Sequence, residues 1–134
     1  MSSETLIQQI FKSKKCMIDR FLRPIGEKRV PLNLEDCFEI LETFGGLDVF
    51  KSTDEDSVIG RYHSNIGMHL RNLWKLWEKS ALKDYFEKMG IFHPDDMSGI
   101  ILLSFHRHLN SKPIELEKQI EFYKEYWKKG DENV

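Results

Sequence analysis

The run from residue 93 to residue 107 joins a helix start to an apolar stretch, and it limits the possible folds more than any other segment of the chain. Pro94 suits the first turn of a helix, where its missing N–H is not needed. Asp95 and Asp96 are favourable beside the positive end of the helix dipole. The residues at 100–103 are all apolar, which indicates burial rather than a surface helix. We therefore predict a central helix over residues 94–109 that other helices surround.

Helical periodicity dominates the rest of the chain, and no segment alternates between apolar and polar residues as a strand does. The apolar side of the third predicted helix includes Trp77, and that of the last includes Trp127. The sequence leaves open whether Trp74 and the other aromatic side chains face the core or a partner. A loop follows the second helix, and its Phe50 is expected to fold back on the core. The fold class is all-α, a single compact domain over residues 1–134 with about six helices, at about 4–22, 33–44, 54–77, 81–89, 94–109 and 113–129.

Two motifs give the chain a resemblance to a known family. The first, H-x-x-x-G-x-x-x-R-N-x-W-x-L-W, begins at His63, and the second, G-I-F-H-P-D-D-M-S-G-I-I-L-x-S-F-H-R, begins at Gly90. They resemble a family of small bacterial helical proteins of unknown function. The resemblance implies a compact helical core over about residues 56–129 and no particular reaction. Residues 1–55 form an N-terminal helical part outside it, apart from a weak likeness at residues 31–38.

Composition places the chain among soluble globular proteins. It has 134 residues, of which 40% are hydrophobic and 12% aromatic, enough to build one core without metal or disulfide support. The longest apolar run is far shorter than the roughly 20 residues that span a bilayer, and the N-terminal residues do not resemble a secretory signal. We therefore expect a cytoplasmic protein without membrane contact, in which Cys16 and Cys37 are reduced.

Charge is unevenly distributed along the chain. Residues 31–60 contain eight acidic residues and one basic residue, Lys51, whereas residues 1–30 contain seven basic and three acidic residues. An acidic surface attracts a basic protein and repels nucleic acid. Alternatively, these charges meet the basic N-terminal helix within the molecule. The candidate partner-binding residues are Glu35, Asp36, Glu39, Glu42, Asp48, Asp54, Glu55 and Asp56.

A second set of polar residues belongs to the two motifs. Arg71 and Asn72 stand in the middle of a helix beside tryptophans, and the ends of the central helix carry His93, His106 and Arg107, which the helix start does not explain. These groups either form an internal network that fixes the packing or line a pocket for an anion or a nucleotide. The full candidate set is His63, Arg71, Asn72, His93, Asp95, Asp96, His106 and Arg107.

The spacing of the polar residues does not indicate catalysis or metal binding. Two histidines that share a metal on one helix stand about three or four residues apart. Here His63 and His69 are six positions apart, and His106 and His108 are two positions apart. The paired aspartates are explained by helix capping, and no nucleophile-elbow motif is present. We predict no catalytic residue, no metal and no cofactor.

The sequence therefore favours a non-enzymatic interaction protein of the bacterial cytoplasm. The expected activity is that of an immunity or inhibitor protein that neutralises a basic toxin or nuclease through the acidic residues. The alternative is a small-molecule-binding, nucleotide-binding or enzymatic domain that uses the His, Arg and Asp set. Nucleic-acid binding is not expected, because the basic clusters are short and no recognition motif is present.

Overall fold

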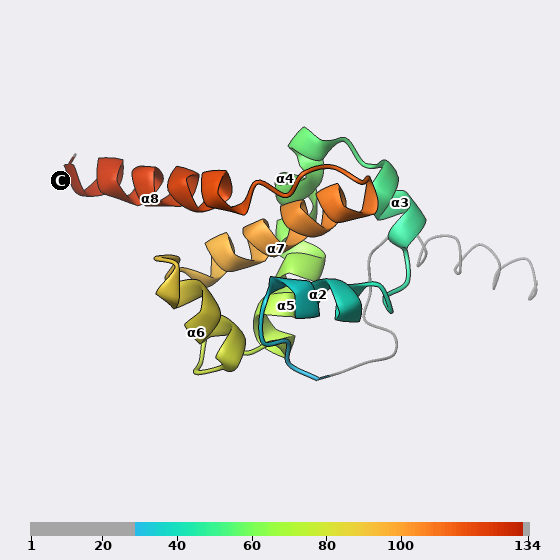
Figure 1. Ribbon diagram of the computed structural model, residues 1–134, viewed down its shortest axis with the longest axis horizontal. Coiled ribbons are helices and arrows are strands. Elements are labelled where there is room, and N and C mark those ends of the chain that lie inside the picture. The colour runs from blue at the N-terminus through green and yellow to red at the C-terminus, as the bar shows by residue number, and fades with distance from the viewer. Residues whose placement is uncertain (1–28, 133–134) are drawn as a thin grey trace, which may run out of the picture.

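The computed structural model of the protein describes residues 29–132 (Figure 1). The helix predicted at residues 4–22 and Cys16 lie outside the described residues. The described part is helical and contains no β-strand, which confirms the predicted all-α class. Its elements are α2 (Leu34–Leu41), α3 (Leu47–Ser52), the 3-10 turn η1 (Glu55–Ser57), α4 (Val58–Tyr62), the π-helical turn η2 (His63–Gly67), α5 (Met68–Leu73), α6 (Ala81–Lys88), α7 (Pro94–Leu109) and α8 (Leu116–Glu132).

Helix α7 lies at the centre of the fold, as predicted. It crosses the middle of the molecule in Figure 1 and packs against α2, α3, α4, η2, α5, α6 and α8. Most of its apolar residues are buried, and so are Ser98, Ser104 and His106, whereas Leu103 and Leu109 are partly exposed. Burial of this much apolar surface is the main stabilising contribution to the fold. The apolar core residues of α7 are Met97, Ile100, Ile101, Leu102 and Phe105.

The segment predicted as one helix over residues 54–77 is a broken rod. It consists of η1, α4, η2 and α5, and it ends at Leu73. Lys75 takes a left-handed φ of 55°, which turns the chain away from the helix axis. The prediction was therefore wrong at its C-terminal end. Trp77 lies beyond this turn with 54% of its surface exposed, so its side chain is not in the core.

The π-helical turn η2 explains which side chains of the rod are buried. An ideal helix has 3.6 residues per turn, so residues spaced by four drift gradually around its surface. A π turn contains additional residues and corrects this drift. The buried apolar side chains of the rod are accordingly spaced by four residues: Val58, Tyr62, Ile66 and Leu70. Trp74, at the cap of α5, continues this spacing.

The helix ends follow the sequence signals closely. Asn33 caps α2 by accepting a hydrogen bond from the Asp36 N–H at 2.8 Å. Ser80 caps α6, and Gly90 follows that helix with a φ of 90°, a conformation that favours glycine. The predicted loop after α2 contains the short helix α3 instead, but its Phe50 is fully buried, as expected.

Helix α8 has the predicted length but lies three residues further along the chain, because it begins at Leu116 and continues through Gly130 to Glu132. Its first half packs on α7 through Gln119, whose amide donates to Ser104 Oγ at 3.0 Å. Its second half extends past the rest of the fold in Figure 1. Trp127 lies on this half and is 48% exposed, so the structure places this side chain outside the core as well.

Candidate functional site

Arg71 is the centre of a polar network at the N-terminal end of α7. Its guanidinium is buried and donates to Ser98 Oγ at 2.8 Å and to the His63 carbonyl at 3.0 Å. Its Nε lies 3.4 Å from Asp95 Oδ1. A Cβ on Gly67 would lie 3.1 Å from Arg71 Nη1, so the glycine leaves room for the guanidinium. These contacts tie the π turn to the start of α7, which is a structural role.

His93 caps the same helix end. Its Nδ1 accepts a hydrogen bond from the Asp95 N–H at 3.0 Å. Because Nδ1 accepts, the proton of the neutral ring is on Nε2. His93 therefore has a structural role as the cap of α7, which the sequence did not indicate.

The His93 ring also joins two tryptophans. Trp77 meets it edge to face with ring centroids 5.7 Å apart, and Trp127 stacks on it at 5.8 Å. The Trp127 indole N–H donates to Asp96 Oδ2 at 2.7 Å, which fixes the orientation of the ring. Burial raises the pKa of Asp96, and this hydrogen bond opposes that effect. Trp127 is thus held against the start of α7.

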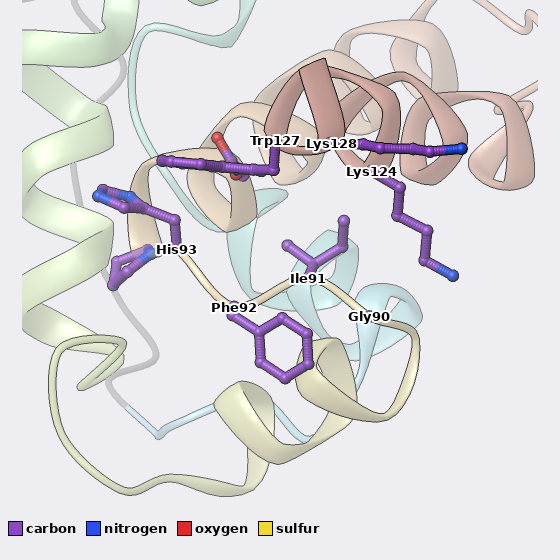
Figure 2. A pocket seen from close by; sticks show the side chains of 9 residues that line it. Gly90, Ile91, Phe92, His93, Lys124, Trp127 and Lys128 are labelled. Carbon is purple, nitrogen blue, oxygen red and sulfur yellow. The ribbon is translucent and has the colours of Figure 1, made fainter. Parts of the chain in front are cut away.

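A groove of about 540 Å³ opens beside Trp127, between the turn that precedes α7 and the second half of α8 (Figure 2). In Figure 2, Ile91 lies between Phe92 and Trp127, and Lys124 and Lys128 extend along the α8 side. Lys124 lies so close over Gly90 that a Cβ at this glycine would clash with its side chain. The groove-lining residues are Gly90, Ile91, Phe92, His93, Pro94, Asp96, Lys124, Trp127 and Lys128.

Large aromatic side chains are exposed around this groove. Phe92 and Trp127 line it, and Phe122, Tyr126 and Trp127 line a second hollow of about 300 Å³ together with His93 and the paired aspartates. The His93 ring connects Trp77 to the same group. These residues form what we call the aromatic surface: Trp77, Phe92, Phe122, Tyr126 and Trp127.

The other end of α7 carries His106 and Arg107. His106 is buried, and its Nε2 lies 2.7 Å from the Thr53 carbonyl oxygen, whereas its Nδ1 has no hydrogen-bond partner in the described structure. Arg107 donates to Glu55 Oε1 at 3.1 Å and to the Ile114 carbonyl at 2.8 Å. Both side chains fasten neighbouring segments to α7.

The eight candidate residues of the polar set therefore do not form one pocket. His63, Arg71, His93, Asp95 and Asp96 lie at the N-terminal end of α7, and His106 and Arg107 lie at its C-terminal end. These ends are separated by about 16 Å along the helix, given a rise of 1.5 Å per residue. Asn72 is exposed, and its side chain makes no hydrogen bond within residues 29–132.

Four of the eight acidic candidates have a partner within the chain: three bind arginines, and Glu42 is hydrogen-bonded to a histidine. Arg29 binds Asp36 at 2.7 Å and Glu39 at 3.2 Å. His108 Nε2 lies 2.8 Å from Glu42, and Arg107 binds Glu55. The side chains without an ion pair in the part of the chain that the structure describes are Glu35, Asp48, Asp54 and Asp56.

Residues 30–109 match a family described as Domain of unknown function (DUF6794). The chain belongs to this family. No curated protein and no solved structure matches the chain significantly. The expectation of an uncharacterised family is thus confirmed.

The DUF6794 match covers only part of the groove lining. Its floor, at residues 90–96, lies inside the matched region, whereas Lys124, Trp127 and Lys128 lie beyond it on α8. The DUF6794 segment therefore supplies the acidic group and the apolar floor, and α8 supplies Trp127 and both lysines.

The sequence pattern did not identify the groove-lining side chains of α8. Trp127 belongs to an apolar stripe that is typical of a buried helix face, and Lys124 and Lys128 resemble ordinary solvated lysines. The available signal was the concentration of aromatic residues at 122–127.

Two further findings concern the described residues as a whole. Within residues 29–132, no three or more His, Cys, Asp and Glu side chains are grouped so that they could hold a metal ion. None of the described helices is long and apolar enough to cross a membrane.

Proposed function

We propose that this DUF6794 protein is an interaction protein that binds another protein through its aromatic surface. The observation that carries the proposal is the set of five exposed aromatic side chains that line two adjoining hollows or contact the His93 ring between them. Contiguous exposed apolar patches on small proteins mark interaction sites. Tryptophan and tyrosine are also the residues on which binding energy most often concentrates.

The fixed position of Trp127 supports this function further. The Asp96 carboxylate and the His93 ring hold the indole in one orientation before any partner arrives. A side chain that is already ordered loses less conformational entropy when it binds. The aromatic surface is therefore suited to rapid and specific contact with a complementary apolar surface.

The test is a comparison of exposed aromatic variants with a matched control. Phe92→Ser and Tyr126→Ser each remove a ring that is more than half exposed, so the fold is expected to remain intact. Leu32→Ser removes an equally exposed apolar side chain from the segment before α2. A partner identified in the native host and then purified should bind the aromatic variants at least about tenfold more weakly. If the partner binds both variants as tightly as the unaltered protein, the proposal is wrong.

The acidic residues support a second candidate, an immunity or inhibitor protein of the bacterial cytoplasm that neutralises a basic toxin or nuclease. Its support is the exposure of Asp48, Asp54 and Asp56, which have no ion pair in the described structure. Uncompensated surface carboxylates accelerate the approach of a cationic partner. Paired carboxylates contribute less to such a field, so the acidic surface is smaller than the sequence alone predicts.

Charge reversal distinguishes this second candidate from the first. Asp54→Lys combined with Asp56→Lys should slow association with a basic partner, most strongly at low salt. Glu121→Lys on α8 is the control for charge reversal at a distant position. Salt-independent association that neither substitution changes would exclude an acidic binding surface. The small-molecule alternative has less support, because its eight residues lie at two ends of α7.

A further inference from the structure

We infer that the groove beside Trp127 receives an apolar side chain flanked by carboxylates, so that the partner of the aromatic surface is an acidic amphipathic segment. This inference rests on the proposed function and adds the chemistry of the partner. Three features of the groove support it: its apolar interior, its unpaired lysines and its continuation past Trp127.

The interior of the groove is apolar and open. Ile91 and Pro94 are buried beneath it, and the exposed rings of Phe92 and Trp127 border it (Figure 2). Its volume of about 540 Å³ leaves room for a large apolar side chain together with the adjoining main chain. Such a side chain would displace water from the groove and cover both rings.

The charge of the groove is positive. Lys124 and Lys128 stand four residues apart on α8, and neither makes an ion pair within the described residues. The one carboxylate that lines the groove, Asp96, is already bound by the Trp127 indole N–H. Carboxylates beside the inserted side chain would therefore meet two uncompensated ammonium groups, whereas a basic segment would be repelled.

The groove continues on the other side of Trp127. A second hollow of about 300 Å³ lies there, and the rings of Phe122 and Tyr126 and the carboxylates of the paired aspartates line it. Two recesses separated by one indole suit a chain that presents successive apolar side chains, as a helical or extended segment does, with its own carboxylates on the side of Lys124 and Lys128. A small anion would occupy one recess and leave the other empty.

Synthetic peptides added to the isotopically labelled full-length protein test the inference directly. The probe is a ten-residue peptide with two leucines among glutamates, and its controls are the same peptide with lysines for the glutamates and with serines for the leucines. We expect the acidic leucine peptide to shift the amide resonances of Gly90, Ile91 and Phe92. Equal shifts with either control would overturn the inference, because charge and apolar anchor are both required.

Variants of the two lysines test whether the preference for an acidic peptide arises from the groove itself. Lys124→Gln and Lys128→Gln should each weaken binding of the acidic peptide by about two- to fivefold, the effect of one exposed ion pair. Lys118→Gln removes the same charge from the first half of α8, which does not line this groove, and should have a smaller effect. Equal weakening by all three substitutions would overturn the inference by indicating a long-range charge effect.

The same variants separate this inference from the proposed function. A native partner that requires Phe92 but binds the Lys124 and Lys128 variants normally would support the proposed function. It would contradict the inference that the bound segment is acidic. Sedimentation of the protein alone tests a second copy as the occupant. A dimer that Phe92→Ser dissociates would assign the aromatic surface to self-association and would overturn both.

Discussion

Gly99 of α7 lies directly beneath the hydroxyl of Tyr123 of α8. A Cβ on Gly99 would lie 2.7 Å from Tyr123 Oη, a separation that real Cβ atoms do not adopt. Burial raises the pKa of the Tyr123 hydroxyl to about 12, with a further contribution from the negative charge of Asp96. This close approach leaves no room for a side chain on α7 beneath Tyr123.

The first prediction is that Gly99→Ala displaces α8 from α7. The added methyl group forces Tyr123 to move and should lower the free energy of unfolding by about 1–3 kcal/mol, as overpacking does. Urea denaturation measures this loss, and Trp127 fluorescence reports the displacement of the helix. Gly60→Ala is the control, because no atom lies within 4 Å of a Cβ at that position. If Gly99→Ala is as stable as Gly60→Ala, the contact does not set the position of α8.

The second prediction is that Arg71 stabilises the fold and is not a ligand-binding residue. Arg71→Lys keeps the charge but cannot serve Ser98, the His63 carbonyl and Asp95 together. It should therefore lower the free energy of unfolding by about 1.5–3 kcal/mol. The neighbouring substitution Asn72→Ala should change it by less than about 0.5 kcal/mol, because that side chain is exposed. Similar stabilities of the two variants would contradict the structural role.

The sequence predicted the fold well wherever local signals decide the outcome. The cap at Asn33, the Pro94 helix start and the glycine after α6 determine helix ends through interactions within a few residues, and all three are confirmed. The broken rod was not predictable in this way. Its π turn and its end at Leu73 depend on packing against α7 and on the Arg71 side chain, which are contacts between distant parts of the chain.

The candidate site was less predictable, because the same residue types serve burial, capping and binding. His93 caps α7 and also lines the groove, and Arg107 binds Glu55, so the residue type alone does not separate a structural role from a binding role. Trp127 lies on an apolar stripe, but the end of α8 extends past the surface that would bury it. Exposure of a side chain depends on where neighbouring helices stop, and periodicity carries no information about that.

The third prediction concerns the Cys37 thiol, which is fully buried in α2. Burial raises its pKa well above 9.0, with a smaller contribution from the charge of Asp36, so the reactive thiolate is scarce. In a Cys16→Ser variant, a thiol-reactive dye should label the native protein only at the rate of unfolding. Labelling should become immediate in denaturing urea. Fast labelling of the native variant would contradict the burial of α2 against the core.

The last prediction is a pH dependence that arises from Glu55. The hydrogen bond from Arg107 lowers the pKa of Glu55 below its ordinary value of 4.5, because it favours the charged carboxylate in the folded state. The pair therefore stabilises the fold above pH 4.5, and this contribution is lost as the pH falls through the lowered pKa. Glu55→Gln should reduce the free energy of unfolding by up to about 1 kcal/mol at neutral pH, since the pair is partly exposed. The free energies of unfolding of the variant and the unaltered protein should then become equal in acid.

Urea denaturation at successive pH values measures this difference in stability, with Asp56→Asn as an exposed control that has no ion pair in the described structure. A gap that stays constant into acid would show that the Glu55 charge does not stabilise the fold.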